Sequence, residues 1–288
     1  MSSWLPTPYE DPFLKYRPFP KELSTNHYAN HWHEILFMVV FYFTIQKISP
    51  YISKKYFGSH YTSLSKRTQI DFDIHVVSMV QCVVSLGSIL PMWNNQFSLN
   101  RVNDTVGSVY GYYPYGGLVA SLAIAYFIWD TYVCLRHFSS FGFGFLFHGV
   151  AALFVFGSTL QPFCMSWVPS FLLFEASTPF VNVNWFSSRL PGIVPEKIVV
   201  VNGILLLISF FSVRILWGFY AMSLVATDLY RTWGMNHWVF PVGLVVINLS
   251  LDALNVYWFY KMLRIAAKKI RGTKSPKSLA KEAAEKID

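Results

Sequence analysis

The chain has 288 residues, of which 53% are hydrophobic and only 13% are charged, and its formal net charge is +8. Soluble domains carry about 25% charged residues, so this composition excludes an ordinary soluble domain. The positive charge is concentrated at the C-terminus, which argues against a nucleic-acid-binding protein. Apolar runs separated by short polar loops instead predict an all-α polytopic membrane protein.

Four regions are expected along the chain. Residues 1–31 contain repeated prolines and no apolar core, so they predict an irregular N-terminal arm and not a cleavable signal peptide. Residues 32–64 are expected to form a first transmembrane helix and a basic cytosolic loop. Residues 65–269 are expected to form the main transmembrane domain, and residues 270–288 a basic cytosolic tail.

About seven membrane-spanning helices are expected, because each apolar run is close to the length that crosses the hydrocarbon layer. The first is the shortest, since Gln46 and Lys47 interrupt it, and the fifth is broken by Pro169 and Pro179. The expected spans are about 32–48, 72–93, 118–135, 141–161, 163–180, 198–222 and 238–262.

Seven spans place the two termini on opposite sides of the membrane. The basic residues after Met262 predict a cytosolic C-terminus by the positive-inside rule, so the N-terminus is expected in the lumen. The loop 94–117 then faces the lumen, and it carries Asn103 in an N-glycosylation sequon, Asn103-Asp104-Thr105. Charge and sequon therefore predict the same orientation.

Polar residues recur at helical spacing in two of the expected spans. Residues at this spacing lie on one face of a helix, and a polar face of this kind is predicted to point into a bundle, away from lipid. The stripe in the second span is Asp71, His75, Ser78, Cys82 and Ser85, and the stripe in the seventh is Asn248, Asp252, Asn255 and Phe259. The residues predicted to line an internal, lipid-binding cavity are His75, Ser78, Arg214, Asn248 and Asp252.

Three neighbouring spans each carry one ionisable residue: Asp130, His148 and Glu175. Ionisable groups at membrane depth are costly and often functional, although they also serve as hydrogen-bonded packing residues. His148 is the candidate general base, with Asp130 or Glu175 to orient it. His148, Glu175 and Asp252 are expected near the middle of the membrane, and Arg214 nearer the lumen.

Other familiar chemistry is missing from the sequence. There is no phosphate-binding glycine loop, no GxSxG and no HExxH motif. His31 and His33, beside Glu34, are interpreted as part of a solvated interfacial loop, so no metal site and no permanently bound cofactor are expected. The three cysteines are interpreted as small buried residues without a disulfide.

Five segments carry a resemblance to a known family. They are KRTQIDFDIHVVSMV, YFIWD, FLFHGVAAL, FEASTPFVNVNWF and FFSVRILWGFY. Over about residues 65–269 the chain resembles the TLC-domain proteins, which include the ceramide synthases and the translocating-chain-associated membrane proteins. The last two segments resemble most a small branch of the type once named transmembrane protein 56.

The resemblance implies a barrel-like bundle of six helices around a lipid-accessible cavity, here with one additional N-terminal span, in the endoplasmic reticulum membrane. Ceramide synthases carry two adjacent histidines in the fourth span. Here the first matches His148, whereas the second position is Gly149, and Glu175 with the STPF stretch replaces the aspartates of the next span. These departures weaken the expectation of N-acyltransferase activity.

Two functions follow as expectations. The first is a protein of lipid homeostasis that binds or handles a membrane lipid, such as a sphingolipid or fatty-acyl lipid, in an intramembrane cavity. The alternative is a ceramide-synthase-like lipid acyltransferase that uses acyl-CoA as co-substrate and His148 as general base. Membrane lipids are the expected partners, and assembly as a homodimer stays open.

Overall fold

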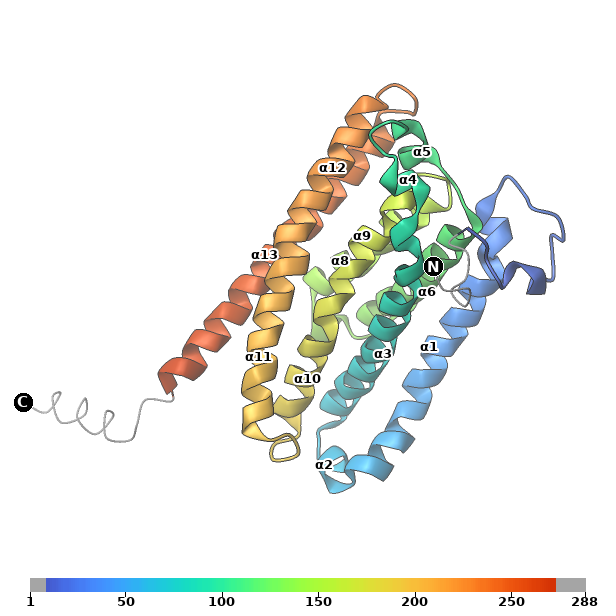
Figure 1. Ribbon diagram of the computed structural model, residues 1–288. Helices are drawn as coiled ribbons and strands as arrows, with labels where there is room; N and C mark the ends of the chain where they lie inside the picture. Colours follow the sequence, from blue (N-terminus) through green and yellow to red (C-terminus); the bar gives the residue numbers. More distant parts are fainter. Residues whose placement is uncertain (1–8, 273–288) are drawn as a thin grey trace, which may run out of the picture.

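The computed structural model describes residues 9–272, and within them all regular structure is helical (Figure 1). The predicted all-α polytopic fold is therefore confirmed. Five helical stretches are long and apolar enough to cross a membrane. They are α1 (His27–Phe57), α3 (Lys66–Ile89, continued by the 3-10 turn η2, Leu90–Asn94), α6 (Pro114–Arg136), α11 and α12 (Glu196–Phe210 and Trp217–Arg231, joined by the π-helical turn η5, Phe211–Leu216) and α13 (Val239–Gly272).

Two further segments run alongside these helices but are shorter or broken. Helix α8 (Phe143–Thr159) has 17 residues. The expected fifth span is a series of short helices: α9 (Val168–Leu172), the 3-10 turn η4 (Leu173–Ser177) and α10 (Thr178–Arg189). Pro169 and Pro179 lie in the first turns of α9 and α10, where the missing N–H breaks no helical hydrogen bond.

The fifth segment continues to Arg189 and does not end near residue 180 as expected. The polar residues after residue 180 suggested that the span had ended. Asn182, however, is only 1% exposed because it faces α3. There it hydrogen-bonds His75 at 2.7 Å and donates to the Ser78 hydroxyl at 3.2 Å. Polar groups that pair across helices can extend a buried helix without facing lipid.

Helix α1 is much longer than the expected span of 32–48 and is one of the longest helices. It begins at His27 because the Asn26 side chain caps it by accepting a hydrogen bond from the Tyr28 N–H. Gln46 does not interrupt it, since its amide oxygen accepts a hydrogen bond from the Trp129 indole on α6 at 3.0 Å. Residues 27–31 thus belong to α1 and not to the arm.

Short helices lie in the arm and in the connections between the long helices. They are η1 (Leu14–Tyr16), α2 (Ser59–Thr62), α4 (Gln96–Leu99), α5 (Thr105–Tyr110), α7 (Phe138–Phe141) and η3 (Met165–Trp167). Arg101 joins the segment that carries α4 and α5 to α12 through a bidentate ion pair with the buried Asp228. Its Nη2 donates to Oδ1 at 2.8 Å and its Nε donates to Oδ2 at 3.1 Å. Such bidentate pairs give geometric specificity.

The ends of the bundle differ. The start of α1, helix α5 and the turn between α12 and α13 lie toward one end, and α2, the turn between α10 and α11 and the end of α13 lie toward the other (Figure 1). The arm folds over the first end: the Tyr9 carbonyl accepts from the Tyr115 N–H, and Arg17 is 8% exposed. The basic tail from residue 273 onward lies outside the described residues.

Candidate functional site

Two segments that depart from α-helical geometry meet in the middle of the bundle. The 3-10 turn η4 packs against the π-helical turn η5. Glu175 lies on the first and Arg214 on the second. Short π-helical turns inside α-helices often occur at functional sites, because they move one side chain out of the regular helical register.

Arg214 is 8% exposed and is held by neighbouring side chains. Its Nε donates to the Ser177 hydroxyl at 2.9 Å and its Nη2 to the Thr178 hydroxyl at 3.3 Å. The guanidinium also lies 6.0 Å from the ring centre of Phe174 and 5.2 Å from that of Phe210, within the range of cation–π attraction. Aromatic rings and hydroxyls therefore hold the cation in place.

The structure gives the position of Arg214 along its helix, whereas its depth in the membrane, expected nearer the lumen, stays a prediction. The helical stretch that contains it runs from Glu196 to Arg231 and is longer than the expected span of 198–222. Residue 214 therefore falls at the middle of the stretch. It lies level with Glu175, which is close enough to act electrostatically on both Arg214 and Asp130.

Asp130 occupies the space beside Gly149, where α6 and α8 come close together. A Cβ atom added to Gly149 would lie 2.8 Å from Asp130 Oδ2 and 3.1 Å from Thr131 Oγ1. The carboxylate thus fills the place that a side chain at residue 149 would need. A second histidine after His148 would not fit unless Asp130 moved.

His148 lies between aromatic rings. Its ring centre is 5.9 Å from that of Phe127 and 5.5 Å from that of Trp258, both nearly perpendicular to it. Within the described residues, the imidazole makes no hydrogen bond to Asp130 or Glu175. It is deep in the bundle yet only half-buried, as is Asp130, so both side chains keep accessible surface.

Helix α13 turns two further polar residues inward, as its spacing predicts. Asp252 and Asn255 are each 3% exposed. Asp252 Oδ1 lies beside Gly218, where an added Cβ would be 3.4 Å away. Asp252 Oδ2 and Asn255 Oδ1 have no hydrogen-bond partner among residues 9–272. Buried unpaired oxygens are uncommon and call for a water or a ligand.

Other predicted cavity residues lie elsewhere. His75 stacks on Trp185, with ring centres 4.2 Å apart, and together with Ser78 it bonds Asn182 in the seam between α3 and α10. Asn248 lines a small cavity of about 20 Å³ beside α8 and α12. An apolar groove of about 380 Å³ follows the outside of the seam between α3 and α10.

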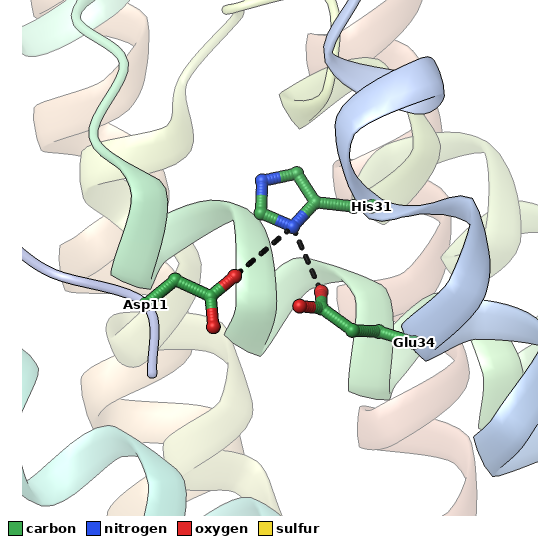
Figure 2. Close-up of side chains that lie close together, drawn as sticks. All are labelled: Asp11, His31 and Glu34. Carbon is green, nitrogen blue, oxygen red and sulfur yellow. Dashed lines mark hydrogen bonds and ion pairs between the residues drawn. The ribbon is translucent and has the colours of Figure 1, made fainter. Parts of the chain in front are cut away.

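The interpretation of His31 and Glu34 as a solvated interfacial loop was wrong. Both belong to α1, and His31 is fully buried. Figure 2 shows the His31 ring facing two carboxylates, with Nδ1 2.8 Å from Glu34 Oε2 and 3.5 Å from Asp11 Oδ2. The signal available in the sequence was Asn26, a favourable helix cap that starts α1 early enough to put residues 31 and 34 on one face.

The chain was also compared with known proteins. A sequence model of the TLC domain family matches residues 71–264, within the segment that carries the resemblance described above. Topoisomerase I damage affected protein 4 of Saccharomyces cerevisiae is 38% identical over 263 residues, which cover 89% of this chain and 91% of that protein. An uncharacterized TLC domain-containing protein of Schizosaccharomyces pombe is 32% identical, covering 94% and 91%. TLC domain-containing protein 4 of Homo sapiens is 28% identical, covering 85% and 89%.

The contact between Gly149 and Asp130 generates a prediction. Gly149→Ala should lower the melting temperature of the purified protein by several degrees, because overpacking a close contact costs about 1–3 kcal/mol. Asp130→Ala should remove most of that penalty in the double variant. The matched control is Gly144→Ala on the same helix, whose Cβ would meet only Leu254 at 3.7 Å. Equal melting temperatures for the two glycine variants would contradict the close contact.

Proposed function

This chain belongs to the TLC domain family, and from its bundle interior we propose that it is a multi-pass membrane protein of lipid homeostasis that binds a lipid between η4, η5 and α8. The observation that carries the proposal is Arg214, a buried cation at mid-bundle whose hydrogen bonds go to two neutral hydroxyls. A guanidinium has five N–H donors, so donors are left over for a ligand.

The surroundings of Arg214 fit the two ends of a lipid. Guanidinium groups suit the carboxylate or phosphate of a lipid headgroup, which they bind with charge-assisted hydrogen bonds. Phe174 and Trp258 are partly exposed and offer aromatic surface for an acyl chain. The half-buried His148 lies on this aromatic wall. A fatty-acyl lipid or sphingolipid with one polar end and one long chain matches this combination.

An acyltransferase is the second candidate, because Asp130 lies against Gly149, the residue next to His148. In that reaction His148 would take a proton from the lipid amine or hydroxyl, which then attacks the thioester carbonyl of acyl-CoA and releases the CoA thiol. A general base of this kind is usually oriented by a hydrogen-bonded third group at about 2.6–3.2 Å. His148 has aromatic neighbours instead, so binding is the better supported function.

Two substitutions test the proposal. Arg214→Gln should weaken binding of a fluorescent C16 fatty acid or ceramide by on the order of ten- to a hundredfold, because charged hydrogen bonds contribute about 1.5–3 kcal/mol. Ser212→Ala, an exposed residue of the same π-helical turn, should leave binding unchanged. His148→Ala should also weaken binding while the protein still purifies as a folded monodisperse species.

The same purified proteins can be used to test whether the chain is an acyltransferase or only a lipid-binding protein. With acyl-CoA and sphingosine, an enzyme would form product, and His148→Ala would reduce turnover by roughly a hundredfold or more. The binding function predicts no product at any substrate concentration. Unchanged binding in both Arg214→Gln and His148→Ala would show that the lipid site lies elsewhere.

We further propose residence in the endoplasmic reticulum with the N-terminus in the lumen and the C-terminus in the cytosol. Asn103 is exposed, and α5, which follows it, lies at the end of the bundle opposite to α2 and the end of α13 (Figure 1). Lys54 and Lys55 lie at the other end, in the last turn of α1 before α2. The positive-inside rule puts that end in the cytosol.

Intact microsomes test this orientation. Protease should remove a C-terminal tag without detergent, and Asn103→Gln should abolish any shift in mobility caused by an endoglycosidase. A C-terminal tag that becomes accessible only after detergent is added would reverse the assignment.

A further inference from the structure

The cluster of Asp11, His31 and Glu34 at the arm end of the bundle is separate from the site around Arg214. One oxygen or nitrogen atom from each side chain lies within 4.8 Å of the other two. The side chains of Asp11 and His31 are fully buried and that of Glu34 is 4% exposed. Glu34 Oε1 and Asp11 Oδ2 have no hydrogen-bond partner in the described part of the chain.

Within the described residues, no lysine or arginine forms an ion pair with either carboxylate of the cluster, and His33 Nε2 lies 3.6 Å from Glu34 Oε1. Arg17 is nearby, but its guanidinium donates to the carbonyls of Pro20, Lys21 and Glu22 and to Asn30. Two buried carboxylates without a cation are unfavourable, whereas a divalent ion would neutralise both.

His31 is arranged to offer its Nδ1 lone pair. Its other nitrogen, Nε2, lies 2.8 Å from the Tyr112 hydroxyl, and a hydrogen bond from Nε2–H to that oxygen would leave Nδ1 free. Metal-binding histidines are commonly oriented in this way through the second nitrogen. Gly117 makes the necessary room, because a Cβ there would lie 2.1 Å from Nε2.

We propose that Asp11, His31 and Glu34 bind one divalent transition-metal ion of the Zn²⁺ class and thereby fasten the N-terminal arm to α1. One neutral imidazole and two carboxylates form a mixed nitrogen and oxygen donor set, which suits Zn²⁺ better than Ca²⁺ or Mg²⁺. Tetrahedral Zn²⁺ places its ligand atoms about 3.3 Å apart. The separations of 2.8 and 3.5 Å from Nδ1 to the two carboxylates lie on either side of that value.

The test uses the full chain, purified in detergent with a tag that contains no histidine, stripped with EDTA and titrated with Zn²⁺. Mass spectrometry of the eluted metal should find one equivalent per chain. Zinc should also slow tryptic cleavage after the exposed Lys15 and Lys21 of the arm. Asp11→Asn should weaken zinc binding at least tenfold and abolish this protection.

Asp11 lies in the arm, outside the bundle, so the Asn variant should fold, whereas a substitution of the fully buried His31 would disturb the packing of α1. Its matched control is Glu22→Gln, an exposed acid of the same arm, which should bind zinc like the unchanged chain. Zinc binding that is equally strong in Asp11→Asn would place the ion elsewhere and overturn the proposal. So would a chain that retains no zinc at micromolar concentrations, since the two carboxyls would then share a proton instead.

Discussion

Hydrocarbon cannot hydrate a charged side chain, so each ionisable group at membrane depth has to find its partners within the protein. Arg214 shows how this constraint organises the bundle. Its guanidinium is held by hydroxyls from the end of η4 and the beginning of α10 and by aromatic rings from η4 and α11. The helices have to approach one another closely enough to supply these groups, which fixes η4 against η5 at the centre.

Departures from regular helix are what make this centre possible. Pro169 and Pro179 divide the fifth segment into short helices and leave the 3-10 turn that carries Glu175 and Ser177. The π-helical turn opposite carries Arg214. A regular pair of α-helices would present a continuous apolar seam here. The irregular pair instead presents a cation, a carboxylate and hydroxyls near His148 and its aromatic neighbours, and this combination is the basis of the proposed lipid site.

Much of this fold could be predicted from the sequence, because apolar length and helical spacing are local properties. They identified α3, α6 and α13 and the inward faces that carry Cys82 and Asp252, both of which are buried. The fifth segment was cut short because its polar residues pair with α3, and no local signal shows which helix they face. The start of α1 was missed although Asn26 could have indicated it.

The contacts of the candidate site were beyond sequence reasoning for a related reason. Arg214 lies 36 residues from Thr178, and nothing in the spacing of either segment indicates that they meet. The close approach of Asp130 to Gly149 depends on how two helices are rotated. The sequence shows that Gly149 replaces the second histidine of the family motif. It does not show that the Asp130 carboxylate fills the space beside this glycine. Asp11 joins His31 only because the arm folds back over the bundle.

The central claim is that the space beside His148 and Arg214 holds a lipid. An electron cryomicroscopy structure of the chain in lipid nanodiscs, with a fiducial antibody fragment bound, measures this directly. The account predicts elongated density along Phe174 and Trp258, with its polar end within hydrogen-bonding distance of Arg214. A bundle interior filled by protein side chains, with Arg214 paired to Glu175 and no additional density, would contradict it.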